Sequence, residues 1–177
     1  MRRLADFSGR MLRWTQTGAF SLLHELRADD TVMATLEFRS SFGCLATGRA
    51  EDRSWTFKRI GFWRPRATVR IEDSADNLAV FEHSTWSGGG SLTLADHRQI
   101  QVTTGSWQTC LEFRDSDGLV LFRYHTEGFM REAAELEILP AAARMSELPW
   151  LLLFGWYLVV MMHRDAGAAV AAVCACG

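Results

Sequence analysis

The sequence predicts a mainly β protein: a closed antiparallel β-barrel of about 12 strands around a buried hydrophobic C-terminal α-helix. Three observations predict this fold. Short segments alternate between apolar and polar residues, turn signals separate them at regular intervals, and an uncharged apolar run, 148–162, follows the last of them. Alternation with period two is typical of strands with one buried and one solvated face. The segments do not alternate with helical patterns, so a doubly wound sheet is disfavoured.

The strands are assigned from this alternation and from the turns between them. In TVMATLEFR (31–39), Val32 and every second residue after it form an apolar face, and WQTCLEFR (107–114) shows the same pattern. The stretches DSADN (73–77) and DSDG (115–118) have the composition of hairpin loops. In chain order, the expected strands are 10–15, 18–26, 31–39, 42–50, 53–60, 66–72, 78–84, 91–95, 98–104, 107–114, 119–125 and 134–139.

The apolar run predicts a helix over 146–165. Ser146 is a good N-cap, and Glu147 suits the positive first turn. The uncharged part would be about 22 Å long, which is shorter than the roughly 30 Å hydrocarbon core of a bilayer. The side chains expected in the core are Trp150, Leu151, Leu152, Phe154, Trp156, Leu158, Val159 and Met161.

The number of expected strands indicates that this helix lies inside the barrel. A barrel of about eight strands fills with its own side chains, whereas a wider barrel needs something inside it. The alternatives are that the apolar run inserts into a membrane or covers an oligomer interface.

The length predicts a single domain, 1–177, with a barrel at 10–140, a central helix at 146–165, and a tail at 166–177 that is disordered or extends the helix.

Composition and cysteine use predict the compartment. The net charge of −2 argues against nucleic-acid binding by bulk electrostatics. Cys44 and Cys110 are expected as small strand residues. The spacing of Cys174 and Cys176 matches neither a redox nor a zinc pattern, and the role of these two cysteines stays open. The basic N-terminal segment lacks the apolar stretch of a signal peptide. We therefore expect a cytoplasmic protein, with peripheral membrane association as an option.

The chain resembles the tubby C-terminal-like superfamily, which includes the LURP-one-related proteins, the phospholipid scramblases and small bacterial relatives. The resemblance rests on LLLFGWYLVVMM (151–162), on the preceding hairpins with DSDG, and on SWTFKRIGFW (54–63). It implies a twelve-stranded barrel wrapped around a hydrophobic helix. It also implies binding of phosphoinositide headgroups by basic residues on the barrel surface, although no individual residue of that site can be aligned to this chain.

The best candidate for a binding surface is the basic and aromatic stretch 55–70. Arginine matches the geometry of phosphate, and an exposed tryptophan suits a headgroup interface. The alternative is that the arginines form the solvated face of two strands while the aromatic residues pack inside. The candidate residues for binding lipid or another anion are Lys58, Arg59, Trp63, Arg64, Arg66 and Arg70.

The other short motifs in the sequence do not complete any catalytic or metal-binding pattern. DSDG lacks the completing Glu of an EF-hand, no Lys-Ser/Thr pair follows SGGGS (87–91), and HRD (163–165) lacks the downstream Asn of a kinase. The five histidines show no metal-binding spacing. We therefore predict no catalytic residue, metal or cofactor.

The function expected from the sequence is that of a non-enzymatic, tubby-like barrel. It would bind anionic phospholipid headgroups or act as a membrane-proximal adaptor with a protein partner, and it would not bind nucleic acid. Two alternatives come from other classes: a protein-interaction or structural module without a ligand, and a scramblase-like protein whose helix inserts into the membrane. An enzyme is the least favoured class.

Overall fold

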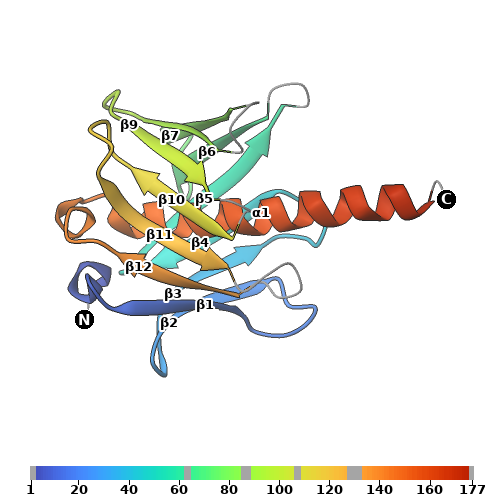
Figure 1. Ribbon diagram of the computed structural model, residues 1–177, viewed down its shortest axis with the longest axis horizontal. Coiled ribbons are helices and arrows are strands. Elements are labelled where there is room, and N and C mark those ends of the chain that lie inside the picture. The colour runs from blue at the N-terminus through green and yellow to red at the C-terminus, as the bar shows by residue number, and fades with distance from the viewer. Residues whose placement is uncertain (1–2, 62–64, 85–88, 106–108, 127–132, 176–177) are drawn as a thin grey trace.

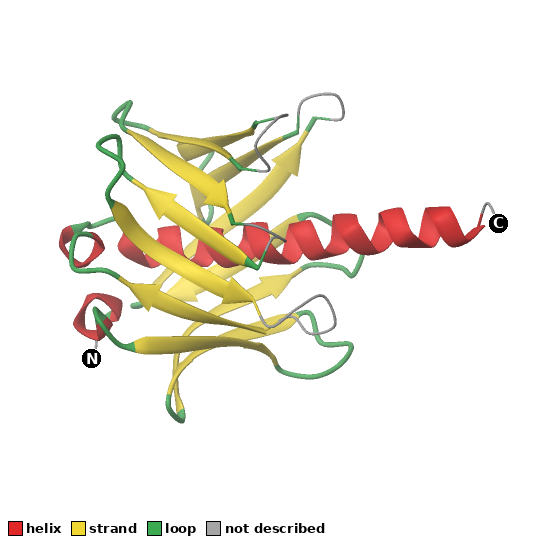
Figure 2. Cartoon of the chain, in the orientation of Figure 1, coloured by secondary structure: helices red, strands yellow, loops and turns green. Residues whose placement is uncertain are grey.

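The computed structural model describes residues 3–61, 65–84, 89–105, 109–126 and 133–175, with the side chains of the last helix described as far as Ala168. Twelve antiparallel strands form one closed barrel, in which strands that follow each other in the chain are paired (Figures 1 and 2). The strands are β1 (Met11–Gln16), β2 (Leu23–Ala28), β3 (Thr31–Phe38), β4 (Leu45–Ala50), β5 (Arg53–Ile60), β6 (Arg66–Ile71), β7 (Asn77–His83), β8 (Gly90–Leu94), β9 (Gln99–Thr104), β10 (Cys110–Arg114), β11 (Val120–Thr126) and β12 (Ala133–Ile138).

The barrel closes because β1 pairs with β12 as well as with β2. The closing register places Met11 opposite Glu137 and Thr15 opposite Ala133. Each of the twelve described strands therefore has two partners, and none of these strands has an open edge that could pair with another chain. The predicted closed antiparallel barrel of twelve strands is confirmed.

The expected strand limits agree with the structure to within a few residues except at the start of β2. The expected range 18–26 is wrong there, because residues 17–22 form a turn instead of a strand. Within that turn, the backbone N–H of Ser21 donates to the carbonyl of Gly18.

The α-helix α1 (Leu148–Ala175) passes through the middle of the barrel, and two short 3-10 helices, η1 (Leu4–Phe7) and η3 (Ala142–Arg144), lie at the end where it begins (Figure 1). Every residue from Trp150 to Met161 is buried, which includes all eight side chains predicted for the core. The predicted buried central helix is confirmed. None of the helices in the described part of the chain is long and apolar enough to cross a membrane.

Aromatic rings from α1 stack against rings from the barrel wall. Trp156 lies parallel to Trp14 of β1, with ring centroids 5.4 Å apart, and Tyr157 stacks on Phe38 of β3 at 5.8 Å. Full burial of a large apolar side chain contributes roughly 1.5–3 kcal/mol. The interior is therefore a packed core in which the helix takes the place that side chains alone fill in narrower barrels.

The limits of α1 differ from the predicted 146–165 at both ends. Ser146 does not cap the helix, because its hydroxyl donates to the carboxylate of Glu147 and α1 begins at Leu148. At the other end, the backbone stays helical to Ala175, so most of the predicted tail extends the helix. Alanine is the strongest helix former, and this segment is rich in alanine. The final turns of α1 project beyond the barrel (Figure 1).

Close to its middle, α1 comes near the wall at Gly155. A Cβ atom at this position would lie 2.6 Å from Cε2 and 2.7 Å from the hydroxyl oxygen of Tyr124 on β11. The Tyr124 hydroxyl donates a hydrogen bond to the backbone carbonyl of Leu152 in the same part of the helix. Gly155, the one residue without a side chain in the apolar run, is therefore required by this close approach.

The predicted apolar face of 31–39 is correct at Ala34, Leu36 and Phe38, all of which are buried. Val32 is different, since it is 41% exposed. The register between β2 and β3 shifts between Leu26 and Arg27, and Arg27 is the residue that pairs with Val32.

Candidate functional site

The pairing of β5 with β6 decides which of the predicted cations share a face. Lys58 lies opposite Thr68, and Arg66 lies opposite Ile60. Successive side chains of a strand point to opposite faces, so Lys58, Arg66 and Arg70 lie on the outer face of the barrel. Arg59 lies opposite the buried Ala67 and points to the inner face. Trp63 and Arg64 lie outside the described residues.

Two of the outer cations contact polar side chains of β7, and one of these side chains is a carboxylate. Arg66 Nε lies 3.0 Å from a carboxylate oxygen of Glu82 on β7. Arg70 Nε donates to the side-chain carbonyl of Asn77 at 2.7 Å, and Lys58 is exposed. The two strands therefore form a cationic outer face of Lys58, Arg66 and Arg70, which we call the outer cation face.

Arg59 instead holds α1 where it leaves the barrel. Its guanidinium nitrogen Nη1 lies 2.6 Å from Oδ2 of Asp165. Next to this ion pair, Arg164 Nη1 donates to the carbonyl of Gly43 at 3.0 Å, and its guanidinium carbon lies 3.9 Å from the centre of the Phe38 ring. The charged residues that end the apolar run thus fasten the helix to the inner rim of the barrel.

The two ends of the barrel differ in chemistry. We call the end where α1 begins the acidic rim. It has five hairpin connections, and each of them carries at least one carboxylate. Four of the five are tight enough that a residue other than glycine adopts a positive φ, as at Asp29, Asp52 and Asp73. Aspartate tolerates this left-handed conformation better than most residues do. The five acidic connections are 29–30, 51–52, 72–76, 95–98 and 115–119.

We call the opposite end, from which α1 projects, the exit rim. Two of its connections, 17–22 and 39–44, are fully described, and neither carries a carboxylate. Each presents a phenylalanine to solvent: Phe20 is 98% exposed and Phe42 is 104% exposed. The remaining connections at this end also carry aromatic residues in the sequence, but the placement of those residues lies outside the described ones. In sequence they are Phe62, Trp63, Trp86, Trp107 and Phe129.

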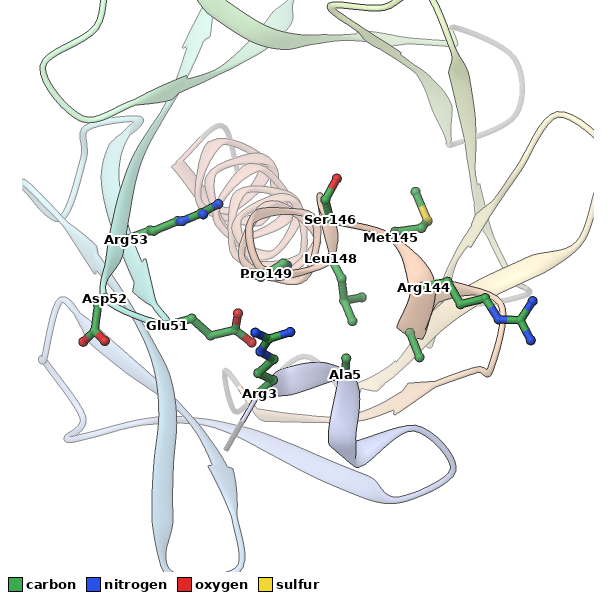
Figure 3. A pocket seen from close by; sticks show the side chains of 11 residues that line it. Arg3, Ala5, Glu51, Asp52, Arg53, Arg144, Met145, Ser146, Leu148 and Pro149 are labelled. Atoms are coloured by element: carbon green, nitrogen blue, oxygen red, sulfur yellow. The ribbon is translucent and has the colours of Figure 1, made fainter. Parts of the chain in front are cut away.

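A polar pocket of about 630 Å³ lies at the acidic rim, around the first turn of α1. Its lining includes Arg3 and Arg53, which point toward it, whereas Arg144 points away (Figure 3). The carboxylate of Glu51 accepts a hydrogen bond from the backbone N–H of Leu4 at 2.7 Å and so ties the N-terminal segment to the barrel. The pocket is lined by side chains of both charges. It includes none of the residues predicted to bind lipid or another anion.

Two features could have indicated enzyme or metal chemistry. Within the described part of the chain, no group of three or more His, Cys, Asp or Glu could hold a metal ion. His24 is fully buried beside Trp156, and burial, followed by the nearby charge of Arg164, lowers its pKa from 6.5 to about 4. Burial also lowers the pKa of His163. These histidines belong to the contact between helix and wall and not to a polar site.

The sequence interpretation missed the exit rim. The signal was present in the order of the loops, because alternate connections of an antiparallel meander fall at the same end of the barrel. Sorted in this way, the five turns at the end where α1 begins all carry a carboxylate, whereas at the exit rim only the connection 127–132 does, and the aromatic connections all fall at the exit rim. Phe20 was missed for a second reason: residues 18–22 were assigned to a strand.

Together, the fold and the surface define a closed twelve-stranded antiparallel barrel with a helical core, a cationic outer face, and two chemically unlike rims. Compared with protein-family models, curated proteins and solved structures, the chain has no significant match. The resemblance to the tubby-like superfamily therefore stays a prediction.

Proposed function

We propose that this protein is a non-enzymatic barrel that associates peripherally with membranes by binding anionic phospholipid headgroups. The observation that carries the proposal is the outer cation face, where the pairing of β5 with β6 places Lys58, Arg66 and Arg70 on one side of the wall. Guanidinium groups form bidentate hydrogen bonds with phosphate, and three cations on two adjacent strands can contact neighbouring headgroups.

The ion pair between Arg66 and Glu82 does not oppose this role. Both side chains are more than half exposed, at 52% and 60%. A solvated ion pair of this kind contributes only about 0–1 kcal/mol, so a phosphate group can replace Glu82 as the partner of Arg66 at little cost.

Vesicle co-sedimentation tests the proposal. The protein is expected to bind vesicles of phosphatidylcholine mixed with phosphatidylserine and to bind vesicles of phosphatidylcholine alone much more weakly. Each cation near an anionic surface contributes about 1 kcal/mol, so changing Lys58, Arg66 and Arg70 together to serine should weaken binding roughly a hundredfold. Raising the salt concentration should release the protein without detergent.

A matched control removes the same charge from another part of the wall. Changing Arg10, Arg13 and Arg27 to serine lowers the net charge equally but leaves the outer cation face intact. This variant should bind almost as well as the parent protein. Equal binding by the two triple variants would reject the outer cation face as the site. No binding of the parent protein to anionic vesicles would reject the function and favour a protein-interaction module.

A further inference from the structure

The two rims and the path of α1 together indicate how the barrel meets a membrane. We propose that the exit rim is the surface that docks, with Phe20 and Phe42 inserted among the headgroups of an anionic bilayer and the acidic rim facing away. This inference rests on the proposed function and adds the orientation of the protein and the residues that enter the lipid.

The exposure of the two phenylalanines is the first argument. Phe20 and Phe42 are 98% and 104% exposed, whereas the other exposed large apolar side chains among the described residues are 41–54% exposed. Single exposed apolar residues are ordinary on a protein surface. These two, however, lie on connections that are adjacent on the same rim, because β2 pairs directly with β3. A phenylalanine this exposed gains free energy when any apolar phase covers it.

The distribution of charge is the second argument, and it selects a lipid surface as the partner. Four of the five hairpin connections of the acidic rim carry carboxylates and no cation, so anionic headgroups would repel them, whereas in the fifth Asp96 is paired with Arg98. On the exit rim, Arg39 opens the connection that carries Phe42, and Lys58 and Arg66 lie near the ends of β5 and β6 that face this rim. Apolar tips with cations behind them match an anionic bilayer, whose headgroups lie outside its acyl chains.

The projecting part of α1 is the third argument. The ion pair between Arg59 and Asp165 holds the helix at the rim, and the backbone continues beyond it as a helix to Ala175 (Figure 1). Residues 166–177 contain no charged side chain. A protein that approaches a membrane with its exit rim would bring this uncharged helical segment to the same surface as Phe20 and Phe42.

The experiment compares two double variants by co-sedimentation with the same two kinds of vesicle. Changing Phe20 and Phe42 to serine should weaken binding to phosphatidylserine-containing vesicles about tenfold or more. The control changes Ile71 and Leu119, which are 50% and 54% exposed at the acidic rim, to serine. The control should bind like the parent protein. All four residues are at least half exposed, so urea denaturation should find both variants as stable as the parent.

The outcomes separate the orientation from the function. If the Phe20/Phe42 variant binds as well as the parent while the outer-cation variant does not, the docking orientation is wrong and headgroup binding stands. If the parent binds neutral vesicles equally well and the Phe20/Phe42 variant does not, the rim docks but headgroup recognition is rejected. If the parent is a dimer that the Phe20/Phe42 variant dissociates with no change in vesicle binding, the rim is an interface between copies and the inference is overturned.

Discussion

Substituting alanine for Gly155 is expected to destabilise the fold by about 1–3 kcal/mol, even though alanine is the better helix former. Helix propensity alone favours alanine by about 1 kcal/mol. Against this gain, the new Cβ would lie 2.6 Å from a ring carbon of Tyr124. The ring is fully buried and surrounded by Phe113, Phe122 and Trp156, so it cannot swing away.

Relief of the clash requires either a shift of the helix or a change in the ring position. Either movement strains the hydrogen bond from Tyr124 to the Leu152 carbonyl, and a buried polar group without its partner costs about 1–3 kcal/mol. The steric and hydrogen-bond costs together therefore exceed the gain in helix propensity.

Urea denaturation of two glycine variants measures this balance. In the same helix, a Cβ at Gly167 would meet no atom within 4 Å, so Gly167→Ala should leave stability unchanged or raise it by up to about 1 kcal/mol. Replacing Tyr124 with leucine should remove most of the penalty for Gly155→Ala in a double-mutant cycle. A Gly155→Ala protein as stable as the parent would refute the close approach of α1 to β11.

Three further predictions concern contacts between the helix and the wall. His24, whose pKa is lowered to about 4, takes up its proton at a lower pH in the folded protein than in the unfolded chain. Stability should therefore fall by up to about 3 kcal/mol as the pH drops from 6.5 to 4, and His24→Leu should flatten that dependence in urea titrations. Asp165→Asn should cost less than about 1 kcal/mol, because its ion pair with Arg59 is partly exposed; a larger loss in thermal unfolding would contradict this. Trp156→Ala should cost about 3–5 kcal/mol by removing the ring stacked on Trp14, and a calorimetric loss below 1 kcal/mol would count against the buried stack.

The architecture could be predicted because the strands and the helix each show a simple pattern of apolar residues in the sequence. Alternation locates strands when one face is buried, as at Leu36 and Phe38, and uniform apolarity over Trp150–Met161 indicates a helix with no solvated face. A barrel of twelve strands is too wide for its own side chains to fill, so the apolar helix is expected in its interior. Alternation was misleading at Val32, where a shift of register at the end of the barrel exposes a residue that the pattern would bury.

The surface was harder to predict from sequence. The sequence interpretation placed Lys58 and Arg59 in one binding surface, but adjacent residues of a strand point to opposite faces. Only the path of α1 in the structure shows that Arg59 forms an ion pair with Asp165. The partners of Arg66 and Arg70 depend on the register with β7 and on the loop after β6. Such contacts depend on how the strands pair and on the path of the helix, so the composition of one segment does not encode them.

The order of elements along the chain has a consequence for biosynthesis. All twelve strands leave the ribosome before α1, although α1 fills the centre of the barrel that they form. At about 5–20 residues per second, the first strand waits roughly ten seconds for the helix that will cover its apolar face. For most of that time β12, which closes the barrel on β1, has not been made, and exposed strand edges are prone to aggregate. We therefore expect the barrel to complete its fold only after α1 has left the ribosome, and nascent chains that stop before Leu148 to be bound by chaperones.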